Sequence, residues 1–411
     1  IEAIAERMDW KHDLYRRIVP HLAPHAILAS NTSGLPIMDL AKGLPDAMHG
    51  RFCGVHFFNP PRYMHLAELI PIAQTAPAVL QGLEAFLTST LGKGVVTARD
   101  TPKLIGNRIG VFSILSTMHH TQAYGLGFDV VDALTGPAIG RPRSATYRTA
   151  DVVGLDTMGH VIKTMGDTLP RDPWHAYFKA PDWMAALVAR GALGQKSGTG
   201  FFRKVGKDIQ VLDLARQDYR LADGGASEAV AAILKLRNPA EKLGQLRESP
   251  DPQAQFLWSV FRDLFHYTAY HLADIADNAR DVDLAIRWGY GWQAGPFETW
   301  QASGWKQVAG WIAADIAAGK AMAKVPLPAW VGDGREGVHG AEGSYAPSIN
   351  AARPRSANPV YRRQHFPDPV LGEKRAAGST LFESDAVRCW TLDDEVGIVS
   401  FKTKLNTVSG G

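Results

Sequence analysis

The sequence predicts an α/β domain at the start of the chain, followed by all-α domains in two copies. Three observations support this prediction. Residues 1–100 alternate helical and strand-like patterns, residues 101–190 are almost purely helical in pattern, and one spacing of Asp and Gly residues occurs twice. Alternating strands and helices are typical of a sheet with helices packed on it. The change of pattern near residue 100 predicts a domain boundary there.

The first hundred residues supply the elements of the α/β domain. Trp10, Leu14, Ile18 and Leu22 recur at every fourth position, which predicts one face of a helix. Apolar runs predict strands at 26–30, 51–58 and 65–71, followed by a helix at 77–92 and a further strand at 94–98.

The helical part begins with a long apolar helix at 103–124. Its predicted start is Thr101-Pro102, because a capping residue followed by proline at the first helical position is a common way to begin a helix.

A weak internal repeat follows this helix. Asp132 precedes Gly140 by eight residues, and Asp283 precedes Gly291 by the same spacing after a second long apolar helix at 254–275. Further glycines, Gly154 and Gly304, follow at nearly the same distance in the two copies. We interpret the repeat as a duplicated small helical domain. Chance similarity between two helical stretches is the alternative.

The C-terminal part has two different patterns. Residues 326–378 are rich in Pro, Gly, Arg and Ser without periodicity, which predicts a linker or extended arm. Residues 386–401 predict two strands around an Asp-Asp-Glu turn.

Composition and charge exclude several classes of protein. With 411 residues, 45% hydrophobic and 21% charged, the chain has the composition of a globular protein of about two to four domains. A net charge of +3 is too small to imply a nucleic-acid partner. The sequence contains no apolar run of about 18 residues, the length that predicts a membrane-spanning helix. Cys53 and Cys389 give neither a disulfide framework nor a metal spacing, which predicts a reducing, cytoplasmic compartment.

Candidate chemical groups gather where predicted strands end. His56 begins the run HFFNP and Glu68 follows twelve residues later, so two neighbouring antiparallel or bent strands would bring the side chains together. A His held by a carboxylate is a common general base, although a His near a strand end is often only structural. Ser33 lies in a polar turn after a strand, where turn chemistry is the alternative explanation. Asn107 lies in an otherwise apolar helix and either faces solvent or reaches a buried polar partner.

Five motifs in order resemble those of the 3-hydroxyacyl-CoA dehydrogenases. They are SNTSG (30–34), HFFNP (56–60) with Glu68, DTPKLIGNR (100–108), VGLD (153–156) and GQKSGTGFF (194–202). The resemblance covers residues 1–207 closely. It implies a partial NAD-binding Rossmann-type domain at 1–100 and a helical substrate and dimerisation domain at 101–207, like the C-terminal domain of 6-phosphogluconate dehydrogenases. A second helical copy at 240–325 resembles the long multifunctional forms. After the linker at 326–378, residues 379–411 resemble the first strands of an enoyl-CoA hydratase domain.

The resemblance also implies roles for individual residues. His56 would take the 3-hydroxyl proton and Glu68 would orient His56, while Ser33 and Asn107 would hydrogen-bond the reacting oxygen. The residues implied in cofactor binding are Glu6, Lys11, Ser33, Asn59 and Lys196. For the two lysines, simple solvated charge is the alternative. The second copy has Trp258 where an ungapped alignment places Asn107, so we expect it to be structural.

The implied activity is oxidation of (3S)-3-hydroxyacyl-CoA to 3-ketoacyl-CoA with NAD in fatty-acid β-oxidation. The resemblance of residues 379–411 implies hydration of enoyl-CoA as a second activity of the whole protein. The implied partners are an acyl-CoA substrate and either a second copy of the chain or a thiolase, with no metal. Two alternatives remain: a non-catalytic scaffold or partner-binding protein derived from a dehydrogenase, and a β-hydroxyacid dehydrogenase acting on a substrate without CoA.

One family motif, the phosphate loop G-x-G-x-x-G, does not precede the first predicted strand. The string at 332–337 fits the pattern but lies in the Pro/Gly-rich segment, without a strand before it or a helix after it. The first residue is Ile rather than Met. We therefore expect an N-terminally truncated sequence that binds nicotinamide cofactor poorly by itself.

Overall fold

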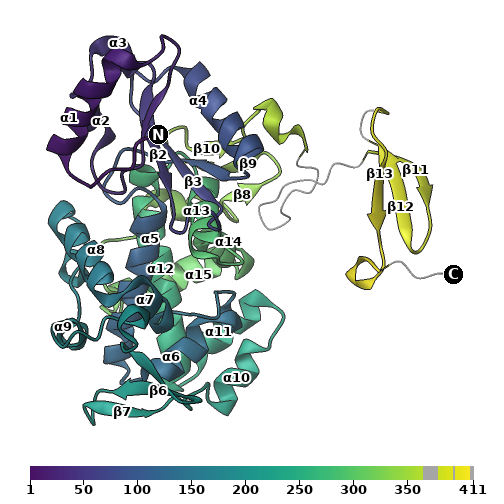
Figure 1. Cartoon of the computed structure of the whole chain (residues 1–411). Coiled ribbons are helices and arrows are strands. Elements are labelled where there is room, and N and C mark those ends of the chain that lie inside the picture. The colour runs from purple at the N-terminus through teal and green to yellow at the C-terminus, as the bar shows by residue number, and fades with distance from the viewer. Residues whose placement is uncertain (364–377, 392–393, 408–411) are drawn as a thin grey trace.

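A four-stranded sheet forms the N-terminal layer of the computed structural model, which describes residues 1–363, 378–391 and 394–407 (Figure 1). Its strands are β1 (Leu28–Ser30), β2 (Phe52–Phe57), β3 (Leu66–Pro71) and β4 (Gly94–Thr97), in that order across the sheet. β1 is parallel to β2 and β3 is parallel to β4, whereas β2 and β3 are antiparallel. The antiparallel pair sets His56 directly opposite Glu68. The four predicted strands are confirmed.

Helices cover both faces of this sheet (Figure 1). One face packs in the core that includes Tyr15, Ile37 and Phe52, and the other packs against Leu83 and Leu87. The helices are α1 (Met8–Ile18) with a short 3-10 extension (Val19–His21), α2 (Ile37–Ala41), α3 (Asp46–His49), and α4 (Pro77–Ala85) continued by a π-helical turn (Phe86–Thr90).

The predicted helix is present as α1, but Leu22 lies beyond its end and the apolar repeat does not mark its most buried side. Trp10 is 52% exposed, and the guanidinium of Arg7 lies 4.9 Å from the centre of its ring. The buried residues of α1 are Lys11 and Tyr15. Both bind the carboxylate of Glu2, so an internal polar cluster, and not the apolar repeat, sets the orientation of the helix.

Two long helices, α5 (Gly106–Ala123) and α12 (Pro252–Ile275), pack against each other below the sheet in the view of Figure 1. The predicted start of α5 at Thr101-Pro102 is wrong. Lys103 and Leu104 adopt left-handed backbone conformations, with φ of 70° and 55°, so the helix begins only at Gly106.

Matching elements follow each long helix. After α5 come α6 (Phe128–Thr135), α7 (Tyr147–Val153), α8 (Leu155–Thr168) and α9 (Asp182–Ala189), and after α12 come α13 (Ala279–Tyr290), α14 (Pro296–Ala302) and α15 (Trp305–Ala317). Asp132 accepts the N–H groups of Thr146 and Tyr147 at the start of α7, and Asp283 accepts those of Phe297 and Glu298 in α14. Gly140 and Gly291 both adopt left-handed conformations. These shared features support the proposed duplication.

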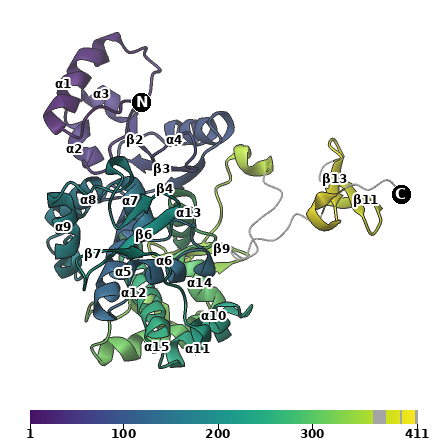
Figure 2. The same ribbon diagram turned by 60° about the horizontal axis from the view of Figure 1, so that its bottom comes forward.

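We call α5–α9 the first helical segment and α12–α15 the second. Between them in the sequence lies an antiparallel three-stranded sheet that the sequence patterns did not predict. Its strands are β5 (Phe202–Val205), β6 (Asp208–Asp213) and β7 (Asp218–Leu221). The sheet contacts α6 and lies at the bottom of the molecule in Figure 1, away from β1–β4, and Figure 2 turns this end toward the viewer. Two helices, α10 (Glu228–Leu234) and α11 (Pro239–Glu248), then lead into α12. In the part of the chain that the structure describes, no helix has the length and apolar character needed to cross a membrane.

The described part of residues 326–378 forms an extended arm, one of the two alternatives predicted for this segment. This part contains a 3-10 turn (Ala329–Gly332), β8 (His339–Gly340), β9 (Gly343–Ala346), β10 (Ala351–Arg353) and a second 3-10 turn (Pro359–Arg363). Residues 364–377 lie outside the described residues.

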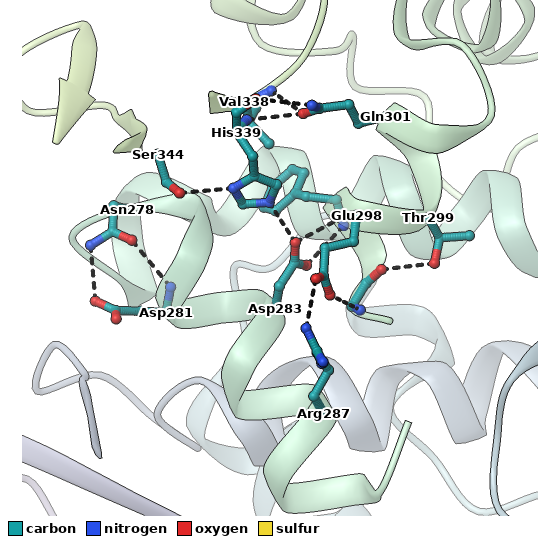
Figure 3. Close-up of polar contacts among 12 residues, drawn as sticks. Asn278, Asp281, Asp283, Arg287, Glu298, Thr299, Gln301, Val338, His339 and Ser344 are labelled. Atoms are coloured by element: carbon teal, nitrogen blue, oxygen red, sulfur yellow. Dashed lines mark hydrogen bonds and ion pairs between the residues drawn. The ribbon is translucent and has the colours of Figure 1, made fainter. Parts of the chain in front are cut away.

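Polar contacts fix this arm to the second helical segment. The ring of His339 lies between Ser344 and Asp283, at 2.8 Å and 2.7 Å (Figure 3). The side chain of Gln301 accepts the N–H groups of Val338 and His339. The strands of this arm are short and do not alternate apolar and polar residues, so the sequence pattern could not predict them. Buried polar contacts hold them in place instead.

The last described elements are β11 (Ser379–Glu383), β12 (Val387–Thr391) and β13 (Ile398–Phe401), joined in an antiparallel sheet, and a 3-10 turn (Lys404–Asn406). The two strands predicted within 386–401 are confirmed, and part of the turn between them lies outside the described residues.

Candidate active site

A buried His–Glu pair lies on the two antiparallel strands of the first sheet, β2 and β3. His56 Nδ1 lies 2.7 Å from Glu68 Oε2, and the two residues are 5% and 0% exposed. The predicted contact on adjacent strands is therefore confirmed. A carboxylate at Nδ1 accepts the proton of that nitrogen, which leaves Nε2 as the proton acceptor of the neutral ring. The pair has the arrangement of a general base with its orienting carboxylate.

The second oxygen of Glu68 is held by the start of α5. The backbone N–H groups of Ile105 and Gly106 donate to Oε1 at 3.0 Å and 2.8 Å. Free N–H groups at a helix N-terminus favour a negative charge, so α5 stabilises the carboxylate that holds His56. The left-handed residues before Gly106 allow this approach. No motif in the sequence predicted it, because the contact joins residues 37 and 38 positions apart.

A pocket of about 900 Å³ opens beside His56. Its lining includes Glu6, Ser33, Asn59 and Lys93, so the structure brings together four of the predicted site residues, counting His56 with Glu6, Ser33 and Asn59. Glu6 accepts the N–H and the hydroxyl of Ser33, at 2.6 Å and 3.0 Å. Glu6 thus fixes the turn after β1 at the edge of the pocket.

Lys11 does not line this pocket. It is 1% exposed and its ammonium lies 2.8 Å from Glu2. Burial raises the pKa of Glu2, but hydrogen bonds from Lys11 and Ser30 outweigh it and leave this pKa below its usual value. Lys11 is therefore engaged in an internal ion pair, and its predicted contact with cofactor finds no support in this geometry.

Lys196 is likewise engaged elsewhere. Its ammonium lies 2.7 Å from Asp156 at the start of α8, and it is not among the residues that line the pocket. This placement agrees with the alternative of a solvated charge.

Asn107 lies in the first turn of α5 and does reach a polar partner, one of the two outcomes expected for it. The hydroxyl of Tyr290 donates to Asn107 Oδ1 at 3.3 Å. Tyr290 ends α13, in the second helical segment. The sequence patterns missed this residue, and the only signal was its position between Gly289 and Gly291. Among the residues that the structure describes, no cluster of His, Cys, Asp and Glu side chains could hold a metal ion.

The α/β layer, the helices that follow it and the buried His–Glu pair beside a pocket are the features expected of a class, the nicotinamide-dependent dehydrogenases. Residues 1–101 match the NAD binding domain of 3-hydroxyacyl-CoA dehydrogenase, and residues 104–204 match the C-terminal domain of the same family. The chain belongs to the 3-hydroxyacyl-CoA dehydrogenase family.

Individual relatives agree with this assignment. A protein of Bacillus subtilis described as a probable 3-hydroxyacyl-CoA dehydrogenase is 40% identical over 309 residues, which are 75% of this chain and 39% of the relative. A Rickettsia prowazekii protein described as a fatty acid oxidation complex trifunctional enzyme is 31% identical over 303 residues, 72% of this chain and 41% of the relative. This chain thus spans about two fifths of the length of both relatives.

A solved structure shows the same fold. The crystal structure of 3-hydroxybutyryl-CoA dehydrogenase from Escherichia coli superposes with a TM-score of 0.60 at 20% identity, covering 80% of this chain and 79% of that one. A Rossmann-type NAD-binding domain followed by a helical C-terminal domain is therefore the fold of this chain.

Proposed function

We propose that the protein containing this chain oxidises (3S)-3-hydroxyacyl-CoA to 3-ketoacyl-CoA with NAD, as a step of fatty-acid oxidation. The observation that carries the proposal is the buried His56–Glu68 pair beside a pocket lined by Ser33 and Asn59. Membership of the family supports the reaction, and the trifunctional relative supports the role in fatty-acid oxidation.

His56 is the general base of the proposed reaction. Its Nε2 accepts the proton of the 3-hydroxyl group, and the charge that forms on the ring is balanced by Glu68 at Nδ1. The amide groups of Ile105 and Gly106 stabilise Glu68 in turn. Asn107 would donate to the reacting oxygen.

The pocket fits the nicotinamide end of a dinucleotide. A carboxamide needs both donors and acceptors, and the Asn59 amide and the Ser33 hydroxyl offer both beside His56. NAD, when bound, would supply the hydride acceptor for C3 of the substrate. Ser33, Asn59 and Glu6 are the residues proposed to line the binding site of the nicotinamide ring.

The proposal for the whole protein includes the domain division. It comprises the NAD-binding domain at 1–100, the helical domain at 101–207, its copy at 240–325, and a hydratase-like domain that starts at 379. We further propose that the whole protein is bifunctional and acts in the cytoplasm. Its proposed partner is a second copy of the chain or a thiolase. The similarity to a trifunctional enzyme supports the multifunctional form.

A spectrophotometric assay tests the activity. The full-length protein is mixed with NADH and acetoacetyl-CoA, and the loss of NADH absorbance is followed. We expect oxidation of NADH that depends on the acyl-CoA. No activity with short or long 3-ketoacyl-CoA substrates would support the scaffold, whereas equal activity with 3-ketoacids that lack CoA would support the β-hydroxyacid dehydrogenase.

A further inference from the structure

Tyr290 reaches from the second helical segment into the first. Its hydroxyl donates to Asn107 Oδ1 at 3.3 Å, across 183 positions of sequence. Its ring occupies the space above Gly110, where an added Cβ would lie 1.9 Å from the Cζ atom of the ring. A glycine at position 110 therefore lets α13 place an aromatic side chain directly against α5.

The same ring is linked by packing to the proposed base. The ring centres of His56 and Phe58 lie 5.0 Å apart, and those of Phe58 and Tyr290 lie 6.1 Å apart. Gly106 leaves room for Phe58, because a Cβ there would lie 2.6 Å from the Phe58 ring. His56, Phe58 and Tyr290 thus form a packed row that crosses from the sheet to the second helical segment.

The hydroxyl of Tyr290 has a chemical consequence for Asn107. An Asn side chain has one acceptor oxygen and one NH₂ group with two donors. When Tyr290 donates to the oxygen, the amide is held with its oxygen toward Tyr290 and its NH₂ group remains for another acceptor. A carbonyl or alkoxide oxygen at the reacting carbon requires such a donor.

The surroundings keep Tyr290 in the form that donates. Burial raises its pKa, and the negative charge of Glu68 raises this pKa further. The O–H group is therefore intact at neutral pH and can donate to Asn107.

We propose that Tyr290 is a positioning residue for the reaction proposed above, and that through it the second helical segment completes the active site of the first by orienting Asn107. The inference rests on the proposed function. It assigns to the second segment a part in turnover, beyond the structural role expected from Trp258.

Tyr290→Phe in the full-length protein tests this inference, because it removes the hydroxyl and keeps the ring. We expect kcat to fall about 3–10-fold, the range of one neutral hydrogen bond, with the KM for NADH unchanged. Tyr345→Phe is the matched control. Tyr345 also donates to an asparagine, Asn350 Oδ1 at 3.0 Å, but in the arm, and its loss should leave kcat unchanged.

A double-mutant cycle separates positioning from a structural effect. Adding Tyr290→Phe to Asn107→Ala should cause no further fall in kcat, because the hydroxyl acts through Asn107. An active wild type whose Tyr290→Phe variant is unimpaired, or an additive cycle, overturns the inference alone. A wild type without acyl-CoA-dependent oxidation of NADH overturns the proposed function and this inference with it.

Discussion

His56 and Glu68 act as one unit in the proposed reaction, since the carboxylate touches the ring at 2.7 Å. His56→Gln should lower kcat about 10²–10⁴-fold, the usual contribution of a positioned acid–base group, and leave NADH affinity unchanged. Glu68→Gln should also lower kcat, and the double variant should lose less than the product of the single effects. Steady-state kinetics and NADH fluorescence titration measure both quantities.

The exposed His175 supplies the control for this series. His175→Gln should behave as wild type. A His56→Gln variant with wild-type turnover would contradict the assignment of the base.

Asp263 is a fully buried carboxylate between two helices of different segments. His120 and Arg262 lie 2.7 Å and 2.8 Å from it. Burial raises its pKa, but the hydrogen bond from His120 and the charge of Arg262 outweigh burial and lower the pKa to about 2. A carboxyl group with a lowered folded-state pKa stabilises the fold above its unfolded-state value, near 4, and loses this contribution as the pH falls toward 2.

Asp263→Asn should therefore lower thermal stability most near neutral pH, by the equivalent of about 3–5 kcal/mol for a broken buried pair. The difference in melting temperature from wild type should narrow as the pH falls from 4 to 2. Asp208→Asn, at an exposed position, should show a small difference that does not change with pH. A difference in melting temperature between Asp263→Asn and wild type that stays constant from pH 7 to pH 2 would refute the stabilising effect assigned to the lowered pKa of Asp263.

At the scale of residues, the sequence predicted the His56–Glu68 contact because strand pairing has a fixed register. It could not predict that Glu2 would bind Lys11 inside the protein, or that Tyr290 would reach Asn107. The partners in these contacts come together only through tertiary packing, and no local period encodes them.

At the scale of elements, α5 and α13 approach closely where glycines lie. Gly110→Ala would place a Cβ 1.9 Å from the Tyr290 ring. The better helix propensity of alanine is worth up to about 1 kcal/mol, whereas overpacking costs about 1–3 kcal/mol, so we expect net destabilisation together with lower kcat. Thermal unfolding and the NADH assay measure the two effects.

Gly159 in α8 is the matched control, because nothing lies within 4 Å of an added Cβ there. Gly159→Ala should keep or slightly raise the melting temperature. If Gly110→Ala stabilised the protein as much as Gly159→Ala, the close contact between the Tyr290 ring and Gly110 would be contradicted.

Elements with a strong period were predictable, and elements held by single polar contacts were not. The long apolar helices and the buried strands β2 and β3 follow from hydrophobic patterns. The arm strands β8–β10 do not, because Asp283 and Gln301 bind them through His339 and backbone groups. The start of α5 was misjudged for a similar reason, since Glu68 determines where its free N–H groups point.

At the scale of the whole molecule, α12 covers an apolar side of α5. The rings of Phe112 and Tyr267 stack with centres 3.7 Å apart, and Arg108 binds both Tyr267 and Asp172 inside the contact. A chain ended at residue 225 would lack α12 and expose this side. Large exposed apolar patches promote association, so we expect this shorter chain to self-associate at concentrations where a chain ended at 363 does not.

Sedimentation velocity on the two chains at equal concentrations measures this difference. A shorter chain that stays monomeric would show that α5 needs no cover, and that the two helical segments are independent.

The hydrogen bonds from the start of α5 to Glu68 also limit which sequence changes the connection between β4 and α5, here called the joint, can accept. Loops commonly tolerate added or lost residues, but the connection between β4 and α5 carries the two N–H groups that meet Glu68 Oε1. One residue more or less there would advance the helix start by about 1.5 Å and turn it by about 100°, and the amides would face away from the carboxylate. Every residue except proline supplies a backbone N–H. This joint is therefore constrained in length as well as at Gly106, where a Cβ would lie 2.6 Å from the Phe58 ring. An insertion there would disable the proposed base without touching His56 or Glu68.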